Sequence, residues 1–141
     1  MQSEKFNKLN KLRKTDYYKN EDEEAFLEKV NYVLQKEEWA SYKDVSLKYP
    51  NIFVFGLPRS GTTIMSQFLI YAFRLGYINN FMARFWLAPL TGIKLSKKIL
   101  GENQNTTFTS DYAKTMNLFD IHEFGYFWRY WLKITSINDA I

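Results

Sequence analysis

The feature that most constrains the fold is a short apolar run followed by a glycine loop and a helical pattern. The run Ile52–Phe55 is β-branched or aromatic at every position and is bounded by Pro50 and Gly56. A run that is apolar throughout is typical of a strand buried on both faces, as in a parallel sheet. Apolar residues then recur at helical spacing from near Thr62 until Gly76, a natural stop. The order strand, loop, helix predicts an α/β, P-loop-like three-layer fold with a parallel sheet.

Only one convincing buried strand is evident, whereas a parallel sheet needs several strands joined by crossovers. We therefore expect the chain to be the helix-rich front portion of a larger domain. Residues 1–20 are polar and basic and are predicted to be flexible. Residues 21–48 are predicted to form a helical segment, which starts with four acids where a helix N-terminus favours negative charge. Residues 49–141 are predicted to form the incomplete domain that carries the loop.

Charge and composition narrow the class of ligand and the compartment. The chain of 141 residues has 19 Lys and Arg against 15 Asp and Glu, for a net charge of +4, and it has no Cys. The excess suits an anionic ligand, but without a basic stripe nucleic acid is not a predicted partner. The lack of Cys removes disulfides and thiolate metal sites, and no metal is predicted. Since neither a signal peptide nor a membrane-spanning stretch is evident, we expect a cytoplasmic protein with at most peripheral membrane contact.

The loop at residues 56–63, GLPRSGTT, has the composition of a phosphate-binding loop. Its two glycines let the backbone approach an anion, and the helix start that follows offers unpaired N–H groups and a partial positive charge. The glycines have the spacing of the nucleoside-triphosphate loop, GxxxxGK(S/T), but Thr62 stands where the lysine would be. The cation is instead Arg59, whose planar guanidinium suits phosphate or sulfate oxygens. This arrangement favours a single phosphate that bears a transferable group over ATP or GTP.

The stretch Pro58-Arg59-Ser60-Gly61-Thr62-Thr63, after an apolar strand, resembles the 5′-phosphosulfate loop of sulfotransferases that use 3′-phosphoadenosine 5′-phosphosulfate (PAPS). Segments 77–80, 83–89 and 122–128 also resemble a bacterial subgroup of this family. The resemblance implies transfer of a sulfuryl group from PAPS to a hydroxyl or amine acceptor, without a metal. It implies that the donor's 5′-phosphate is bound by Pro58, Arg59, Ser60, Gly61, Thr62 and Thr63.

Two departures from the family pattern concern the general base and the 3′-phosphate. Some members carry a catalytic glutamate near the end of the helix after the loop, where this chain has residues 79–83 without an acid. The family's second motif, an Arg and a Ser that bind the nucleotide's 3′-phosphate, has no clear counterpart before Ile141. We therefore expect a truncated N-terminal fragment that binds the donor weakly or not at all.

His122, the single histidine, and its neighbour Glu123 are equal candidates for the general base that removes the acceptor proton. A histidine titrates near neutrality, and burial can raise the pKa of a carboxyl group toward the same range. Adjacent residues on a helix point about 100° apart, so we expect only one of them to act. The alternative is that His122 packs among the surrounding aromatic residues. Arg84 and Arg129 are interpreted as surface cations or as further anion contacts.

The sequence leaves the acceptor open, because a carbohydrate, a lipid head group, a peptide tyrosine or a small metabolite would each suit an aromatic-lined site. Two other functions also stay open. One is a P-loop nucleotide or metabolite kinase, against which the missing lysine counts. The other is a non-catalytic nucleotide-binding remnant that acts through partners.

Overall fold

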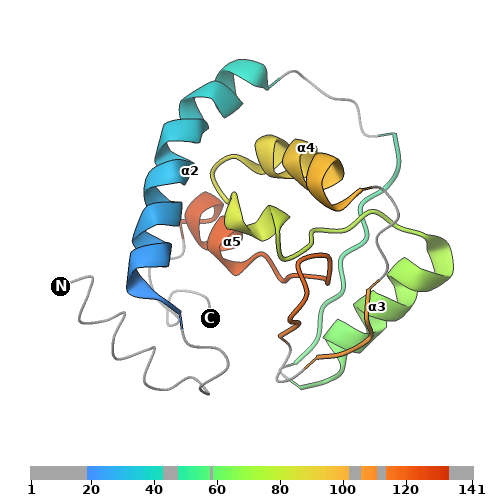
Figure 1. Ribbon diagram of the computed structural model, residues 1–141. Helices are drawn as coiled ribbons and strands as arrows, with labels where there is room; N and C mark the ends of the chain where they lie inside the picture. The colour runs from blue at the N-terminus through green and yellow to red at the C-terminus, as the bar shows by residue number, and fades with distance from the viewer. Residues whose placement is uncertain (1–18, 43–47, 58, 102–105, 111–113, 134–141) are drawn as a thin grey trace.

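The computed structural model describes residues 19–42, 48–57, 59–101, 106–110 and 114–133. Of residues 1–20, which are predicted to be flexible, all but the last two lie outside these ranges. In Figure 1, α2 runs along one side of the molecule and α3 lies on the opposite side, with the other helices between them. The elements are α2 (Glu21–Ser41), α3 (Thr62–Phe73), the 3₁₀ helix η2 (Met82–Arg84), α4 (Pro89–Leu100) and α5 (Gly125–Trp131).

The predicted α/β fold with a parallel sheet is wrong, because the described ranges are helix-rich and contain no strand. Residues 51–57 contain neither helix nor strand and run as an extended trace in Figure 1, but they have no strand partner among the described residues, and Phe53 and Phe55 are 61% and 87% exposed. The β-bridge seen in these ranges is isolated and joins Asn79 to Ile121 in antiparallel orientation. An apolar run becomes a buried strand only when neighbouring strands supply hydrogen-bond partners and cover both of its faces. Within the described residues, that condition is not met.

Helix α2 starts where the sequence provides a cap and a cluster of acids. The Asn20 side chain accepts hydrogen bonds from the backbone N–H groups of Asp22, at 2.9 Å, and Glu23, at 3.1 Å. It thereby satisfies two of the donors that a helix leaves unpaired at its start. The helix extends to Ser41, and residues 43–47 lie outside the described ranges.

Helix α4 is anchored to α2 at its N-terminus. Pro89 occupies the first turn, where its missing N–H costs no hydrogen bond. The carboxylate of Glu38, a buried residue of α2, accepts from the backbone N–H groups of Leu90 and Thr91. It also accepts from the Thr91 hydroxyl at 2.9 Å. A carboxylate from one helix therefore caps the positive end of the other and sets how the two helices meet.

Polar side chains contribute much of the interior. Asn31 of α2 is fully buried, and its Nδ2 donates to the Arg84 carbonyl at 2.7 Å. Its Oδ1 accepts from the Leu87 N–H at 2.9 Å. This one amide therefore ties α2 to the connection between η2 and α4. Among the described residues, the buried apolar side chains are Ala83, Leu87, Ala88 and Phe124.

Helix α5 packs on α2 through aromatic rings. The ring centroids of Trp39 and Trp131 lie 5.3 Å apart. Gln35 Nε2 donates to the Tyr130 hydroxyl at 2.8 Å, and Trp131 Nε1 donates to the Trp86 carbonyl at 3.3 Å. The aromatic residues near the end of the chain therefore join α5 to the rest of the fold. As far as the structure is described, none of its helices combines the length and apolar character needed to cross a bilayer.

Candidate functional site

The loop at residues 56–63 lies between the extended residues and the start of α3 (Figure 1). Arg59 and Gly61 both have a left-handed backbone, with φ of 66° and 85°. Glycine adopts such angles freely, whereas they cost an arginine about 1–2 kcal/mol. The Ser60 N–H donates to the Leu57 carbonyl at 3.1 Å and closes a tight turn. Unfavourable backbone angles of this kind cluster at binding sites. Pro58, predicted to belong to the same site, lies outside the described residues.

Gly56 lies close to two side chains of the loop. A Cβ on this residue would lie 2.4 Å from Ser60 Oγ and 2.7 Å from Thr62 Cγ2. Real side chains essentially never approach so closely, so any larger residue would displace the Ser60 and Thr62 side chains. Gly56 therefore leaves space for the Ser60 and Thr62 side chains, and Gly61 permits the positive φ before α3.

Helix α3 presents its N-terminus to the loop, with Gly61 as its N-cap. A glycine N-cap has no side-chain acceptor to offer the N–H groups of the first turn. The helix has 12 residues and contributes a partial positive charge at this end. Arg59 and Ser60 are exposed beside it, and Thr62 and Thr63 are half-buried in its first turn. The loop therefore has the donors and the charge to bind one phosphate or sulfate group at an open surface.

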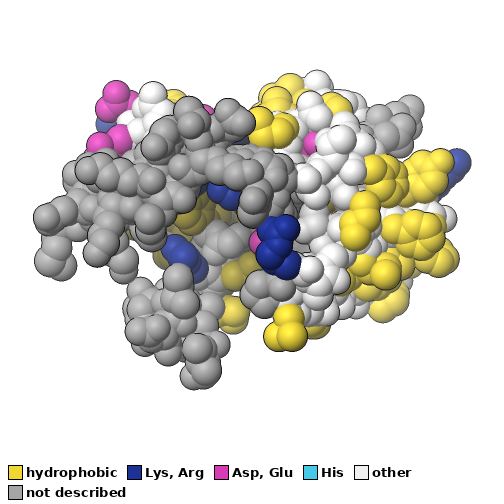
Figure 2. Space-filling view, turned by 90° about the horizontal axis from the view of Figure 1, so that it is seen from below, with side chains coloured by type: hydrophobic (Ala, Val, Ile, Leu, Met, Phe, Trp, Pro, Cys, Tyr) yellow, Lys and Arg dark blue, Asp and Glu magenta, His cyan; other side chains and the backbone are white. Residues whose placement is uncertain are grey.

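The two candidate bases, His122 and Glu123, line a cavity of about 570 Å³. Its walls come from the start of α2, the η2 region and residues 114–129. In Figure 2, Lys and Arg side chains stand at the rim of a hollow in the face seen from below. The charged and aromatic residues of the lining include Lys19, Glu23, Glu24, Arg84, Trp86, Lys114, Tyr126 and Arg129.

The hydrogen bonds of His122 define where its proton lies. Its Nδ1 accepts the backbone N–H of Phe124 at 2.7 Å, so in the neutral ring the proton is on Nε2. Although the residue as a whole is exposed, partial burial of the imidazole lowers its pKa from the ordinary 6.5, and the charge of Lys19 lowers the pKa further. A neutral ring in this state donates through Nε2 and has no free lone pair for an acceptor proton. The exposed carboxylate of Glu123 does have free lone pairs.

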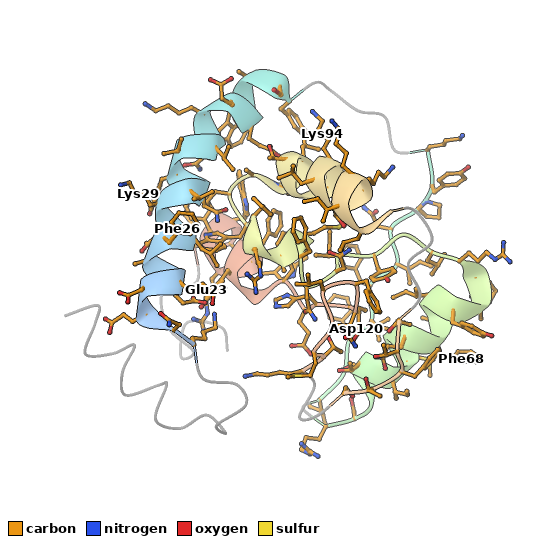
Figure 3. All side chains as sticks on the ribbon, viewed as in Figure 1. Glu23, Phe26, Lys29, Phe68, Lys94 and Asp120 are labelled. Atoms are coloured by element: carbon orange, nitrogen blue, oxygen red, sulfur yellow. The ribbon has the colours of Figure 1, made fainter. Side chains whose placement is uncertain are left out.

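A charged cluster next to these bases was missed by the sequence prediction. Lys19 Nζ pairs with Glu24 at 2.8 Å and lies 4.1 Å from the centroid of the Tyr126 ring. The Tyr126 hydroxyl donates to Glu24 at 2.6 Å. Lys19 and Tyr126 are 107 positions apart, so no pattern along the chain brings them together. Arg84 is exposed and forms an ion pair at 2.8 Å with Glu23, which is labelled in Figure 3. This contact fits the interpretation of Arg84 as a surface cation.

Asp120 holds the segment that leads to His122. It is fully buried and accepts from the Thr107 N–H at 2.8 Å, the Thr107 hydroxyl at 3.0 Å and the Asn117 N–H at 3.2 Å. Two residues later, the His122 N–H donates to the Ile78 carbonyl at 2.9 Å. Figure 3 shows Asp120 between the main helices, close to the middle of the molecule. Nothing in the sequence marks this aspartate as a buried anchor, because its partner Thr107 lies 13 residues earlier in a separate segment.

The loop and the candidate bases do not share a cavity. Of the described residues that line the cavity of His122 and Glu123, none belongs to the loop at 56–63. The structure therefore places both candidate bases at one cavity, and Arg59 does not belong to its described lining. Throughout the ranges that the structure describes, no three or more His, Asp or Glu side chains gather to form a metal site. In comparisons with family models, curated proteins and solved structures, the chain matched none of them.

Proposed function

We propose that this chain binds PAPS through the loop at residues 56–63 and serves sulfuryl transfer to a hydroxyl or amine acceptor. The observation that carries the proposal is the loop, an exposed turn with Arg59 and Gly61 in left-handed conformation directly before a helix start. The 5′ end of PAPS is one phosphate that bears a sulfuryl group. The first-turn N–H groups of α3, the Arg59 guanidinium and the Ser60 hydroxyl suit such a short anion. Thr62, in place of a lysine, disfavours a triphosphate.

In the proposed reaction, the acceptor oxygen or nitrogen attacks sulfur in line, and the bond from sulfur to the bridging phosphate oxygen breaks. Adenosine 3′,5′-bisphosphate leaves, and the N–H groups of α3 and Arg59 stabilise its new negative charge. The acceptor proton passes to Glu123, because Nδ1 of His122 is occupied by the Phe124 N–H. His122 donates through Nε2 and orients the acceptor. This role for Glu123 requires that the acceptor bridge the loop and the cavity.

Thermal unfolding with adenosine 3′,5′-bisphosphate tests donor binding. We expect the bisphosphate to raise Tm without magnesium, because a ligand at about 100 times its Kd stabilises the folded state by about 2.7 kcal/mol. Arg59→Ala should remove most of this rise. The matched control is Arg74→Ala, since Arg74 is also an exposed arginine with a left-handed backbone, φ 49°, but lies at the opposite end of α3. A rise with magnesium-ATP and none with the bisphosphate would refute the proposal, as would an equal loss in both variants.

A second function, nucleotide binding without transfer, is favoured by the separation of the loop from the cavity of His122 and Glu123. Incubation with PAPS and a panel of sugar, lipid, peptide and small-metabolite acceptors distinguishes the two functions. Transfer yields adenosine 3′,5′-bisphosphate and a sulfated acceptor, which liquid chromatography with mass detection resolves. Stabilisation by the bisphosphate, with no sulfated product from any acceptor, would favour binding alone.

A further inference from the structure

The cavity that His122 and Glu123 line has an aromatic wall and an excess of positive charge. The wall includes the rings of Trp86 and Tyr126, whose centroids lie 5.0 Å apart. The described lining contains four Lys and Arg side chains and three carboxylates. Its volume of about 570 Å³ is typical of pockets that bind small organic ligands. Such a cavity suits a ligand that has a ring and a negative charge.

Four of the charged groups in this lining pair with one another, and Arg129 is not among them. Lys19 pairs with Glu24 at 2.8 Å, and Arg84 pairs with Glu23 at 2.8 Å. Within the described part of the chain, the Arg129 side chain has neither an ion pair nor a hydrogen bond. Its planar guanidinium is therefore available for the oxygens of an anionic ligand, which it can bind through two parallel hydrogen bonds.

Helix α5 places Arg129 beside the aromatic wall. Gly125, Tyr126 and Arg129 all line the cavity, and their spacing of three and four residues puts them on one side of the helix. Glu123 lies just before this helix and lines the same cavity. Among the described residues, its carboxylate has no ion-pair partner either. A ligand in the cavity can therefore present an anionic group to Arg129 and a hydroxyl group to Glu123.

The position that a cationic ligand needs is filled by the protein itself. The Lys19 ammonium donates to both carboxylate oxygens of Glu24, at 2.8 and 2.9 Å. It also lies 4.1 Å from the centroid of the Tyr126 ring. A carboxylate and an aromatic face are the groups that bind an ammonium group well. An amine ligand would have to displace Lys19, which belongs to the cavity wall, so the cavity disfavours cationic ligands.

We propose that this cavity binds the acceptor of the sulfuryl transfer, and that the acceptor is a hydroxyl compound with a ring and an anionic group. The anionic group, a carboxylate, sulfate or phosphate, binds the Arg129 guanidinium. The ring lies against Trp86 and Tyr126, and the hydroxyl group donates to Glu123. The role as acceptor rests on the proposed function, whereas binding in the cavity does not require the loop at residues 56–63.

Three phenols that share a ring and a hydroxyl group but differ in charge test this inference. They are para-hydroxyphenylacetate, which is anionic, its neutral amide and the cationic amine tyramine. His122 is the single histidine and lines the cavity, so the NMR signals of its ring report binding there without PAPS. We expect the anionic phenol to bind about 10-fold more tightly than the amide, and tyramine to bind most weakly. Equal affinities, or tighter binding of tyramine, would overturn the proposal.

Arg129→Gln tests which side chain holds the anionic group. It should lower the affinity for para-hydroxyphenylacetate about 10-fold and leave that for the amide unchanged, because it removes the charge of the guanidinium. Lys133→Gln is the matched control, since Lys133 is an exposed cation just after α5 and outside the described lining. Equal losses in both variants would show that the net charge of the protein, and not Arg129, selects the anion.

A second series, glucuronate, glucose and glucosamine, distinguishes a sugar ring from an aromatic one. Tighter binding of glucuronate than of glucose would support the same anionic anchor with a sugar ring. If neither anionic probe shifts the His122 signals more readily than its neutral counterpart, the proposal is refuted, even where adenosine 3′,5′-bisphosphate raises Tm. Incubation with PAPS then tests the role as acceptor, and a bound anionic probe that yields no sulfated product would refute that role.

Discussion

Replacing Asp120 with asparagine tests whether one buried carboxylate holds the segment before His122 in place. One oxygen of Asp120 accepts from the Thr107 N–H at 2.8 Å, and the other accepts from the backbone and side-chain N–H groups of Asn117, both at 3.2 Å. Asparagine has the same shape, but its Nδ2 donates. When Nδ2 occupies the position next to Asn117, two hydrogen bonds to a charged acceptor are lost, each worth about 1.5–3 kcal/mol. We therefore expect Asp120→Asn to lower the free energy of unfolding by about 3 kcal/mol or more.

Urea unfolding followed by far-ultraviolet circular dichroism measures this loss. It would be a large fraction of the total, because native domains are stable by only about 5–15 kcal/mol. Asp22→Asn is the matched control, since Asp22 is exposed in the first turn of α2, where its charge is worth about 0.3–1 kcal/mol. A loss below about 1 kcal/mol in Asp120→Asn, or equal losses in both variants, would refute the inference that these hydrogen bonds hold the segment.

Two further predictions concern α4 and His122. Glu38→Ala should lower the free energy of unfolding by about 2 kcal/mol, because it removes the acceptor for two N–H groups of α4 and for the Thr91 hydroxyl. In the same urea titration, Glu37→Ala, at the exposed neighbouring position, should change it by no more than about 0.5 kcal/mol. Because the pKa of His122 is lowered below 6.5 in the folded state, the unfolded chain binds more protons at this group, and stability should fall as pH drops through 6.5 toward the folded pKa. His122 is the single histidine, so NMR titration of its ring protons gives the midpoint directly, and a midpoint at or above 6.5 would contradict the prediction.

Part of the candidate site was predictable from short stretches of sequence. The helix predicted to begin near Thr62 does begin there, and Gly61 before it has the positive φ that a glycine permits. That the two candidate bases line a cavity was not predictable from the sequence. Lys19 and Tyr126 both line this cavity but are 107 positions apart, and their shared contact with Glu24 follows no spacing rule. The roles of the loop and of Glu123 in sulfuryl transfer stay predictions.

Local sequence determines where α2 and α3 start, because a helix closes its hydrogen bonds between residues four positions apart and is capped by an immediate neighbour such as Asn20. The sheet predicted from Ile52–Phe55 failed for the converse reason. A strand takes its hydrogen bonds from another segment, and the described residues provide none for this one. The same dependence on distant partners explains why Asp120 was not recognised as a buried anchor, since its partner Thr107 lies 13 residues before it. It also explains why the outward-facing apolar side of α3 was not predicted. Those outcomes follow from how the whole chain packs, and no short window of sequence contains them.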